Sequence, residues 1–150
     1  MLKRFRRPLA WLIAIEAAVY LVGRFVEHRM TRGDESTDEF RVAAICNGKE
    51  FHSHAEHLKS GAVVAGMGGV DIDLRDATLD PEGAHLDLNA TMGGIQLTVP
   101  EEWAVEFESD TLAGGFEADV KNRDDLPPDA PRLHVHATTR MGGATITAEN

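Results

Sequence analysis

The chain has 150 residues, and its 25 acidic and 15 basic side chains give it a formal net charge of −10. Seven of the basic residues but only two of the acidic ones lie in the first 33 positions, so the remainder is strongly acidic and repels nucleic-acid phosphates. Cys46 is the only cysteine, which excludes a disulfide within the chain. We therefore expect a soluble acidic domain behind a basic N-terminal extension, with no nucleic-acid partner.

Residues 1–30 have the pattern of a membrane anchor. Basic residues precede an apolar stretch from Leu9 to Val26, whose length approaches the roughly 20 residues needed to cross a bilayer. Because no small-residue cleavage site follows, a retained single-pass helix is favoured over a signal peptide, and an amphipathic surface helix is the other alternative. The leading basic residues predict a cytoplasmic N-terminus and an extracytoplasmic β domain in the cell membrane.

Three polar residues interrupt this apolar stretch at a spacing of four. Glu16, Tyr20 and Arg24 would share one face of a helix. They indicate either a polar seam that meets another membrane helix, or a water-exposed glutamate in a tilted anchor.

A polar linker over residues 31–39 precedes a region whose pattern is that of strands. Residues 40–46 and 49–54 flank Asn47-Gly48, a dipeptide that predicts a two-residue hairpin. Further alternating segments cover residues 84–90, 103–108 and 133–137, and no long helical period occurs after residue 40.

Paired glycines recur four times between residues 67 and 144, and an alternating apolar and polar run follows each pair. Repetition of this kind predicts stacked rungs that bury one another's apolar edges. Laid over one another, the runs give three core columns and place acidic and polar residues on a solvated outer face. The columns are Val70, Ile95, Phe116 and Ala144; Ile72, Leu97, Ala118 and Ile146; and Leu74, Val99, Val120 and Ala148.

Residues 40–150 are thus predicted to form an all-β domain, a β-solenoid-like stack with glycines at its corners. The glycines would supply positive φ or close backbone approach. A β-sandwich is the alternative fold. The methionines before three of the glycine pairs, Met67, Met92 and Met141, are expected to pack at the corners rather than to bind copper.

Candidate ligands are sparse, and no catalytic or cofactor-binding motif is found. His52 and His54 would share one strand face, and with His57 they are the candidate metal ligands. We expect a protein that is not an enzyme and that carries no cofactor.

Two segments carry a resemblance to a known family. Residues 61–79, which include Met67-Gly68-Gly69-Val70, resemble the C-terminal domain of LiaF-type cell-wall-active antibiotic response proteins. Residues 89–100, followed by Trp103, are similar to the second rung of that family, and the likeness extends over roughly residues 40–148. The resemblance implies a part in envelope-stress signalling through restraint of a sensor kinase. In that family several membrane helices precede the domain, whereas this chain has one candidate.

These observations predict a membrane-anchored, non-enzymatic sensing or interaction module of the bacterial cell envelope. Its expected partners are the lipid bilayer and another membrane or envelope protein. The alternative is a self-assembling scaffold, because glycine-cornered rungs also occur in the polymer-forming bactofilins. In that case the chain would be a homo-oligomer that stacks through exposed terminal rungs such as residues 141–148.

Overall fold

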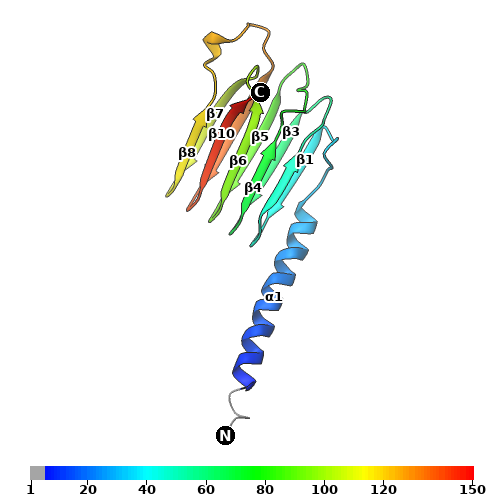
Figure 1. Ribbon diagram of the computed structural model, residues 1–150, viewed down its shortest axis with the longest axis vertical. Helices are drawn as coiled ribbons and strands as arrows, with labels where there is room; N and C mark the ends of the chain where they lie inside the picture. The colour runs from blue at the N-terminus through cyan, green and yellow to red at the C-terminus, as the bar shows by residue number, and fades with distance from the viewer. Residues whose placement is uncertain (1–5) are drawn as a thin grey trace.

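The computed structural model describes residues 6–150, and for residues 6–14 and Glu27 it describes the backbone only. The basic residues Lys3 and Arg4 of the predicted anchor therefore lie outside the described residues. Helix α1 (Arg6–Met30) extends from one edge of a β domain that holds all the strands (Figure 1). Along the described chain, helix α1 is followed by a short connection and then by the strands, which begin at Glu39.

Ten strands form two five-stranded sheets in which every pair of neighbours is parallel. Sheet A has the order β1-β3-β5-β9-β7, and its strands are β1 (Glu39–Ala44), β3 (Ser60–Ala65), β5 (Ala84–Ala90), β9 (Arg132–Thr139) and β7 (Ala104–Thr111). Sheet B has the order β2-β4-β6-β10-β8, and its strands are β2 (Lys49–His52), β4 (Gly69–Asp73), β6 (Gly94–Pro100), β10 (Gly143–Glu149) and β8 (Gly115–Asp119).

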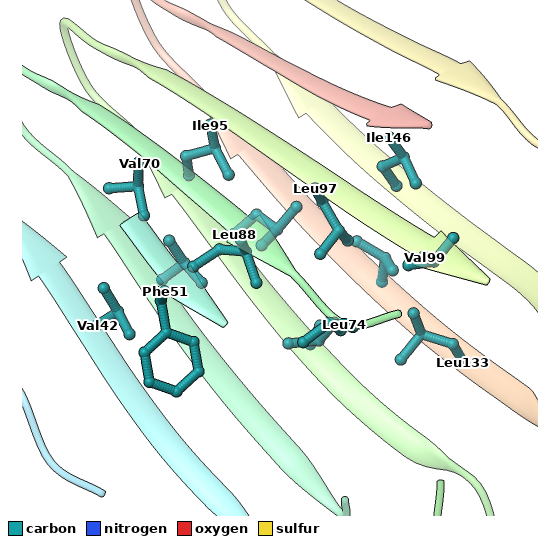
Figure 2. Close-up of a cluster of buried hydrophobic side chains, with 14 of the residues drawn as sticks. Val42, Phe51, Val70, Leu74, Leu88, Ile95, Leu97, Val99, Leu133 and Ile146 are labelled. Atoms are coloured by element: carbon teal, nitrogen blue, oxygen red, sulfur yellow. The ribbon is translucent and has the colours of Figure 1, made fainter. Parts of the chain in front are cut away.

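Each rung consists of one strand from sheet A, a corner, and one strand from sheet B. The rungs stack in register, with Val70 beside Ile95, Ile95 beside Ala144, and Ala144 beside Phe116. The predicted core columns are therefore confirmed, and Figure 2 shows Val70, Ile95, Leu97 and Ile146 in one buried cluster. The parallel pairing confirms a solenoid-like stack, since a conventional sandwich is built from antiparallel strands.

The last two rungs do not stack in the order of the sequence. The rung β9–β10 lies between β5–β6 and β7–β8, so residues 141–148 are internal and the expectation that they end the stack is wrong. At one inward position this order leaves a polar residue at the end of the stack. The inward positions of β9 include Ala137, whereas its partner in β7 is Ser109, which is left exposed at the end. The hydroxyl group of buried Thr139 donates a hydrogen bond to Thr111 Oγ1 of the outer rung (2.9 Å), so this polar group is not left unpaired in the core.

Asn47-Gly48 does not form the predicted hairpin. Strand β1 pairs with β3 and β2 pairs with β4, so the dipeptide joins two different sheets instead of two neighbouring strands. The positive φ of this turn, 63°, falls on Cys46. In a stack of rungs, the backbone hydrogen bonds of each strand are made with the equivalent strand of the next rung. Strands that follow one another in the chain therefore do not pair as a hairpin.

The first glycine of each pair lies against the backbone of the neighbouring rung. A Cβ on Gly68 would stand 1.8 Å from the Asn47 carbonyl oxygen, and one on Gly93 would stand 2.0 Å from that of Gly68. Gly142 and Gly114 continue this glycine column at 2.0 and 1.9 Å from the next carbonyl oxygen. Of the two reasons predicted for the corner glycines, close approach is therefore the general one, and only Gly114 has a positive φ (147°).

Helix α1 and the segment after it cover the first rung. Gly23 packs beside the Ile45 backbone, and Arg32 forms an antiparallel bridge with Arg41 through hydrogen bonds of 2.9 and 2.6 Å. Residues of α1 before Gly23 extend past the corners, and large apolar side chains there, such as Val19 and Leu21, are 56 and 65% exposed. Over the residues with described side chains, no helix reaches the length and apolar character that crossing a membrane requires.

The two glycines of one corner provide a matched test of the column. Gly93→Ala places a methyl group on a carbonyl oxygen, so we expect it to lower the free energy of unfolding by about 3 kcal/mol or more. Gly94→Ala meets nothing within 4 Å, so we expect a change within about 1 kcal/mol. Urea denaturation followed by circular dichroism measures both, and equal destabilisation would show that close approach is not what the corner requires.

Candidate functional site

The two ends of the stack differ, and the uncovered end is the rung of β7 and β8, hereafter the open rung. Within β7, Ala104 is buried and Glu106 is half-buried, whereas every residue from Phe107 to Thr111 is exposed. The rings of Phe107 and Phe116 lie against each other at the edge of the core, tilted by 45° with centroids 5.1 Å apart. Leu112, at the corner of the rung, is 83% exposed. The open rung thus presents apolar side chains that other rungs bury.

The backbone of β7 has a free hydrogen-bonding edge. Ala104 and Leu112 donate their N–H groups to the carbonyls of Pro131 and Thr139, at 2.8 and 3.0 Å. Since successive residues of a strand point their backbone groups to opposite sides, the N–H groups of odd-numbered residues such as Ser109 point away from β9. An additional strand finds unused donors and acceptors along this edge.

Carboxylates line the outer face of the open rung. Glu106, Glu108 and Asp110 alternate along β7, and the outer face of β8 adds Glu117 and Asp119. The connection between β8 and β9 neutralises the first of these carboxylates, because Arg123 forms an ion pair with Glu106. The second half of β7 lacks such a cover, since Glu108 and Asp110 are exposed.

A histidine row crosses the outer face of sheet A beside the open rung. His85 of β5 stacks on His134 of β9 with ring centroids 5.0 Å apart, and His134 Nδ1 lies 3.2 Å from Glu106 Oε2. Two residues further along the strands, on the same face, His136 lies between Asp87 and Glu108 in the register. These residues line a groove of about 350 Å³. The shared face of His134 and His136 follows from strand alternation, but His85 joins them only through the stacking of separate repeats.

The three histidines predicted as metal ligands are not brought together. His52 Nδ1 lies 3.5 Å from Asp73 and His54 Nδ1 lies 3.8 Å from Asp76. Strand β2 ends at His52, so the alternation that would place His54 and His57 on its face does not continue. Among the described side chains, no three from histidine, cysteine, aspartate and glutamate are grouped to hold a metal ion.

Asp73 and Arg75 form the best-defined ion pair of the domain. Arg75 Nη2 donates to Asp73 Oδ2 at 2.7 Å, and the Asp73 side chain is only 18% exposed. The hydrogen bond from Arg75 lowers the pKa of the Asp73 carboxyl from its ordinary 3.8 to about 2. Arg75 also lies 3.7 Å from Glu149, so the pair connects the second rung to the end of β10.

Two other sets of predicted residues are exposed. Glu16, Tyr20 and Arg24 lie on the described surface of α1, and the polar seam against a second helix remains a prediction. The corner methionines are 46–63% exposed, so the expectation that they pack at the corners is wrong. The side chains at these positions project outside both sheets because the glycine column fills the inside of the corner.

Comparisons with known proteins add no identification. No family model matches this chain, and searches of curated proteins and of solved structures also find no match.

The Asp73 carboxyl provides a pH-dependent prediction. Because its pKa is about 2 in the folded protein and near 3.8 when unfolded, its stabilisation is complete above about pH 5 and disappears as the pH falls towards 2. We expect Asp73→Asn to lower the free energy of unfolding at pH 7 by about 1 kcal/mol, and the difference from the wild type to shrink below pH 4.

Urea denaturation at a series of pH values measures this difference. Asp71→Asn is the matched control, because Asp71 lies on the same outer face of β4 without the Arg75 contact. A pH-independent difference between Asp73→Asn and the wild type would contradict the role assigned to the ion pair.

Proposed function

We propose that this chain is a non-catalytic interaction module, tethered at a membrane of the bacterial cell envelope, whose open rung receives an extended basic segment of a partner protein. The observation that carries this proposal is the asymmetry of the stack. Helix α1 and the Arg32 bridge lie against the first rung, whereas the last rung leaves a strand edge and the Phe107 side chain uncovered, with Phe116 half-buried beside it.

Strand addition is the mode of binding that fits this edge. A partner segment beside β7 would become the sixth strand of sheet A and would use the outward N–H and carbonyl groups from Phe107 to Thr111. Every second side chain of that segment would face inward over Phe107, which favours an apolar residue at those positions. The alternate side chains would lie in the outer row beside Glu108 and Asp110.

Charge determines which segment fits. Opposite charges on adjacent strands stabilise pairing and like charges oppose it, so Glu108 and Asp110 favour lysine or arginine on the added strand. The chain itself provides an internal example, because Arg123 lies against Glu106 in the covered half of β7. A segment with basic residues at alternate positions would pair with Glu108 and Asp110 in the second half of β7, as Arg123 pairs with Glu106 in the first half.

The same carboxylates argue against the alternative of a self-assembling scaffold. Two copies that met through their open rungs would bring two rows of glutamate and aspartate side by side. Such a contact is opposed by like-charge repulsion on the strand edge, a means by which natural sheets avoid edge-to-edge aggregation. A second copy is therefore the less favoured occupant.

The tether is proposed for α1. Its described apolar side chains have no cover in the domain, and Val19, Leu21 and Val22 are 56–65% exposed. A lipid bilayer would bury them, and the apolar stretch of residues 9–26 is of suitable length in the sequence. The resemblance to LiaF-type proteins supports an envelope setting, and within it a signalling partner.

A labelled peptide of alternating lysine and valine tests strand addition to the full chain in detergent. We expect binding, measured by fluorescence anisotropy, that weakens with salt because the attraction is electrostatic. Ser109→Pro removes an outward N–H and crowds the free edge, yet it leaves the β9 pairing in place, so it should weaken binding at least tenfold. Ser109→Ala is the matched control and should bind as the wild type does.

The charge and the hydrogen-bonding parts of this proposal are separable. A peptide of the same sequence with every backbone nitrogen methylated keeps its charge but cannot add as a strand, so its binding should be at least tenfold weaker. Equal binding of both peptides, or of Ser109→Pro and the wild type, would rule out strand addition. Concentration-dependent oligomers of the unliganded protein in sedimentation velocity would instead favour the scaffold.

Membrane tethering is tested by Val19→Asp in the full chain. A charged residue in the middle of a membrane helix costs about 2.5–3.5 kcal/mol, so we expect a large part of the variant to move from the membrane fraction to the soluble fraction of cells. Leu112→Asp, which places the same charge at an exposed apolar position of the β domain, should leave the distribution unchanged. A wild-type protein that is absent from the membrane fraction would refute the tether but not the peptide site.

A further inference from the structure

Four sulfur-containing side chains occupy one equivalent position in four consecutive rungs. Ala44 pairs with Ala65, which places Cys46 beside Met67 two residues later. The Met92 N–H donates to the Gly66 carbonyl and the Met141 N–H donates to the Thr91 carbonyl, at 2.9 and 2.8 Å, so the same register continues to Met92 and Met141. We call this set the sulfur row, and it consists of Cys46, Met67, Met92 and Met141.

The sulfur row faces solvent along its whole length. Cys46 is exposed, and Met67, Met92 and Met141 are 56, 46 and 63% exposed. Methionine side chains in this position contribute little to the core, which is complete inside the corner without them. An uninterrupted line of exposed thioethers beside a thiol is therefore not explained by packing.

The spacing of the rungs suits an ion held between neighbouring sulfurs. Adjacent strands lie about 4.8 Å apart, and a typical metal–sulfur bond to a soft or borderline ion is about 2.3 Å long. Two such bonds in line span about 4.6 Å, so one ion can bridge two rungs with no change in the backbone. The three rotatable bonds of methionine allow the small adjustment that remains.

We propose that the sulfur row binds a soft monovalent metal ion, of the class of Cu(I) and Ag(I). Thiolate and thioether ligands select such ions over hard cations, which prefer oxygen. Cys46 would supply the anionic ligand and release its thiol proton on binding, while Met67 and Met92 would supply neutral thioethers. Met141 extends the row by one further ligand. This site is independent of the peptide edge and of the membrane tether.

The glycine column is what makes the row possible. Gly68, Gly93 and Gly142 directly follow the three methionines, and Asn47, which follows Cys46, supplies the carbonyl oxygen that Gly68 contacts. These contacts hold the rungs in register at the corner. The sulfur positions are therefore set by the backbone before any ion binds. A preorganised site of this kind requires ordering of side chains only.

Silver titration of the purified full chain tests the proposal, because Ag(I) needs no reductant. Isothermal titration calorimetry in chloride-free buffer should show saturable binding with release of a proton. Met67→Leu and Met92→Leu conserve volume and should each weaken Ag(I) binding at least tenfold without changing the urea midpoint. Cys46→Ser should weaken it further, whereas Met30→Leu, which lies at the end of α1 outside the row, should have no effect.

Two results would overturn the proposal. The first is no saturable Ag(I) binding by the wild type. The second is loss of binding in Cys46→Ser together with wild-type binding in both methionine variants, because that combination means an isolated thiol and no row. Weaker binding in both methionine variants supports the row, whatever the outcome at the open rung.

Discussion

The structure depends on the contact between each first corner glycine and a carbonyl oxygen of the neighbouring rung. The carbonyl stands where a Cβ would be, at 1.8–2.0 Å from the ideal position, so no other residue fits without a shift of the backbone. Hydrogen bonds between the corners, such as the 3.1 Å bond from the Gly94 N–H to the Gly68 carbonyl, accompany this contact. The column therefore fixes both the distance between rungs and their register.

Strict register converts a repeat in sequence into rows of like residues in space. Inward positions become the continuous core, and outward positions become rows whose chemistry depends on what each repeat carries. The histidines on the outer face of sheet A and the sulfur row at the corner are two such rows. Neither of them requires a cleft, because the sheet itself holds neighbouring side chains at one strand spacing.

The strands and the core columns could be predicted because alternation and the glycine pairs are local signals. Val70, Ile95 and Ala144 align as the sequence indicates, since each follows its glycine pair directly. The order of the rungs could not be predicted in the same way, because every rung offers equivalent backbone partners. The inward faces of the last two rungs differ in polarity only where Ser109 of β7 lies beside Ala137 of β9. A single position of this kind is too weak a signal to order the rungs from the sequence.

The same limit explains the errors at the candidate site. Asn47-Gly48 has a strong local preference for a hairpin, but pairing with the next rung outweighs it. The histidine row combines residues from separate repeats, so a window of adjacent residues does not show it. The three methionines of the sulfur row are visible once the repeats are aligned, whereas Cys46 joins them only through the register of the first rung. The sequence predicted a metal site at His52, His54 and His57 because they lie within six residues of one another. In the fold, His52 and His54 lie against different aspartates, Asp73 and Asp76.

The exchanged order of the last two rungs links folding to the exposed edge. In the described structure, β7 pairs with β9 and β8 pairs with β10, and both partners come later in the sequence. The open rung therefore lies at the end of the stack although it precedes the β9–β10 rung in the chain. The rung at the end keeps Ser109 at an inward position of β7, and the like charges of its acidic outer row oppose pairing with a copy of itself. In the sequential order, β9 would have been the end strand of sheet A. Its inward position Ala137 corresponds to Ser109 of β7, so the exchange places one more polar side chain at the open end.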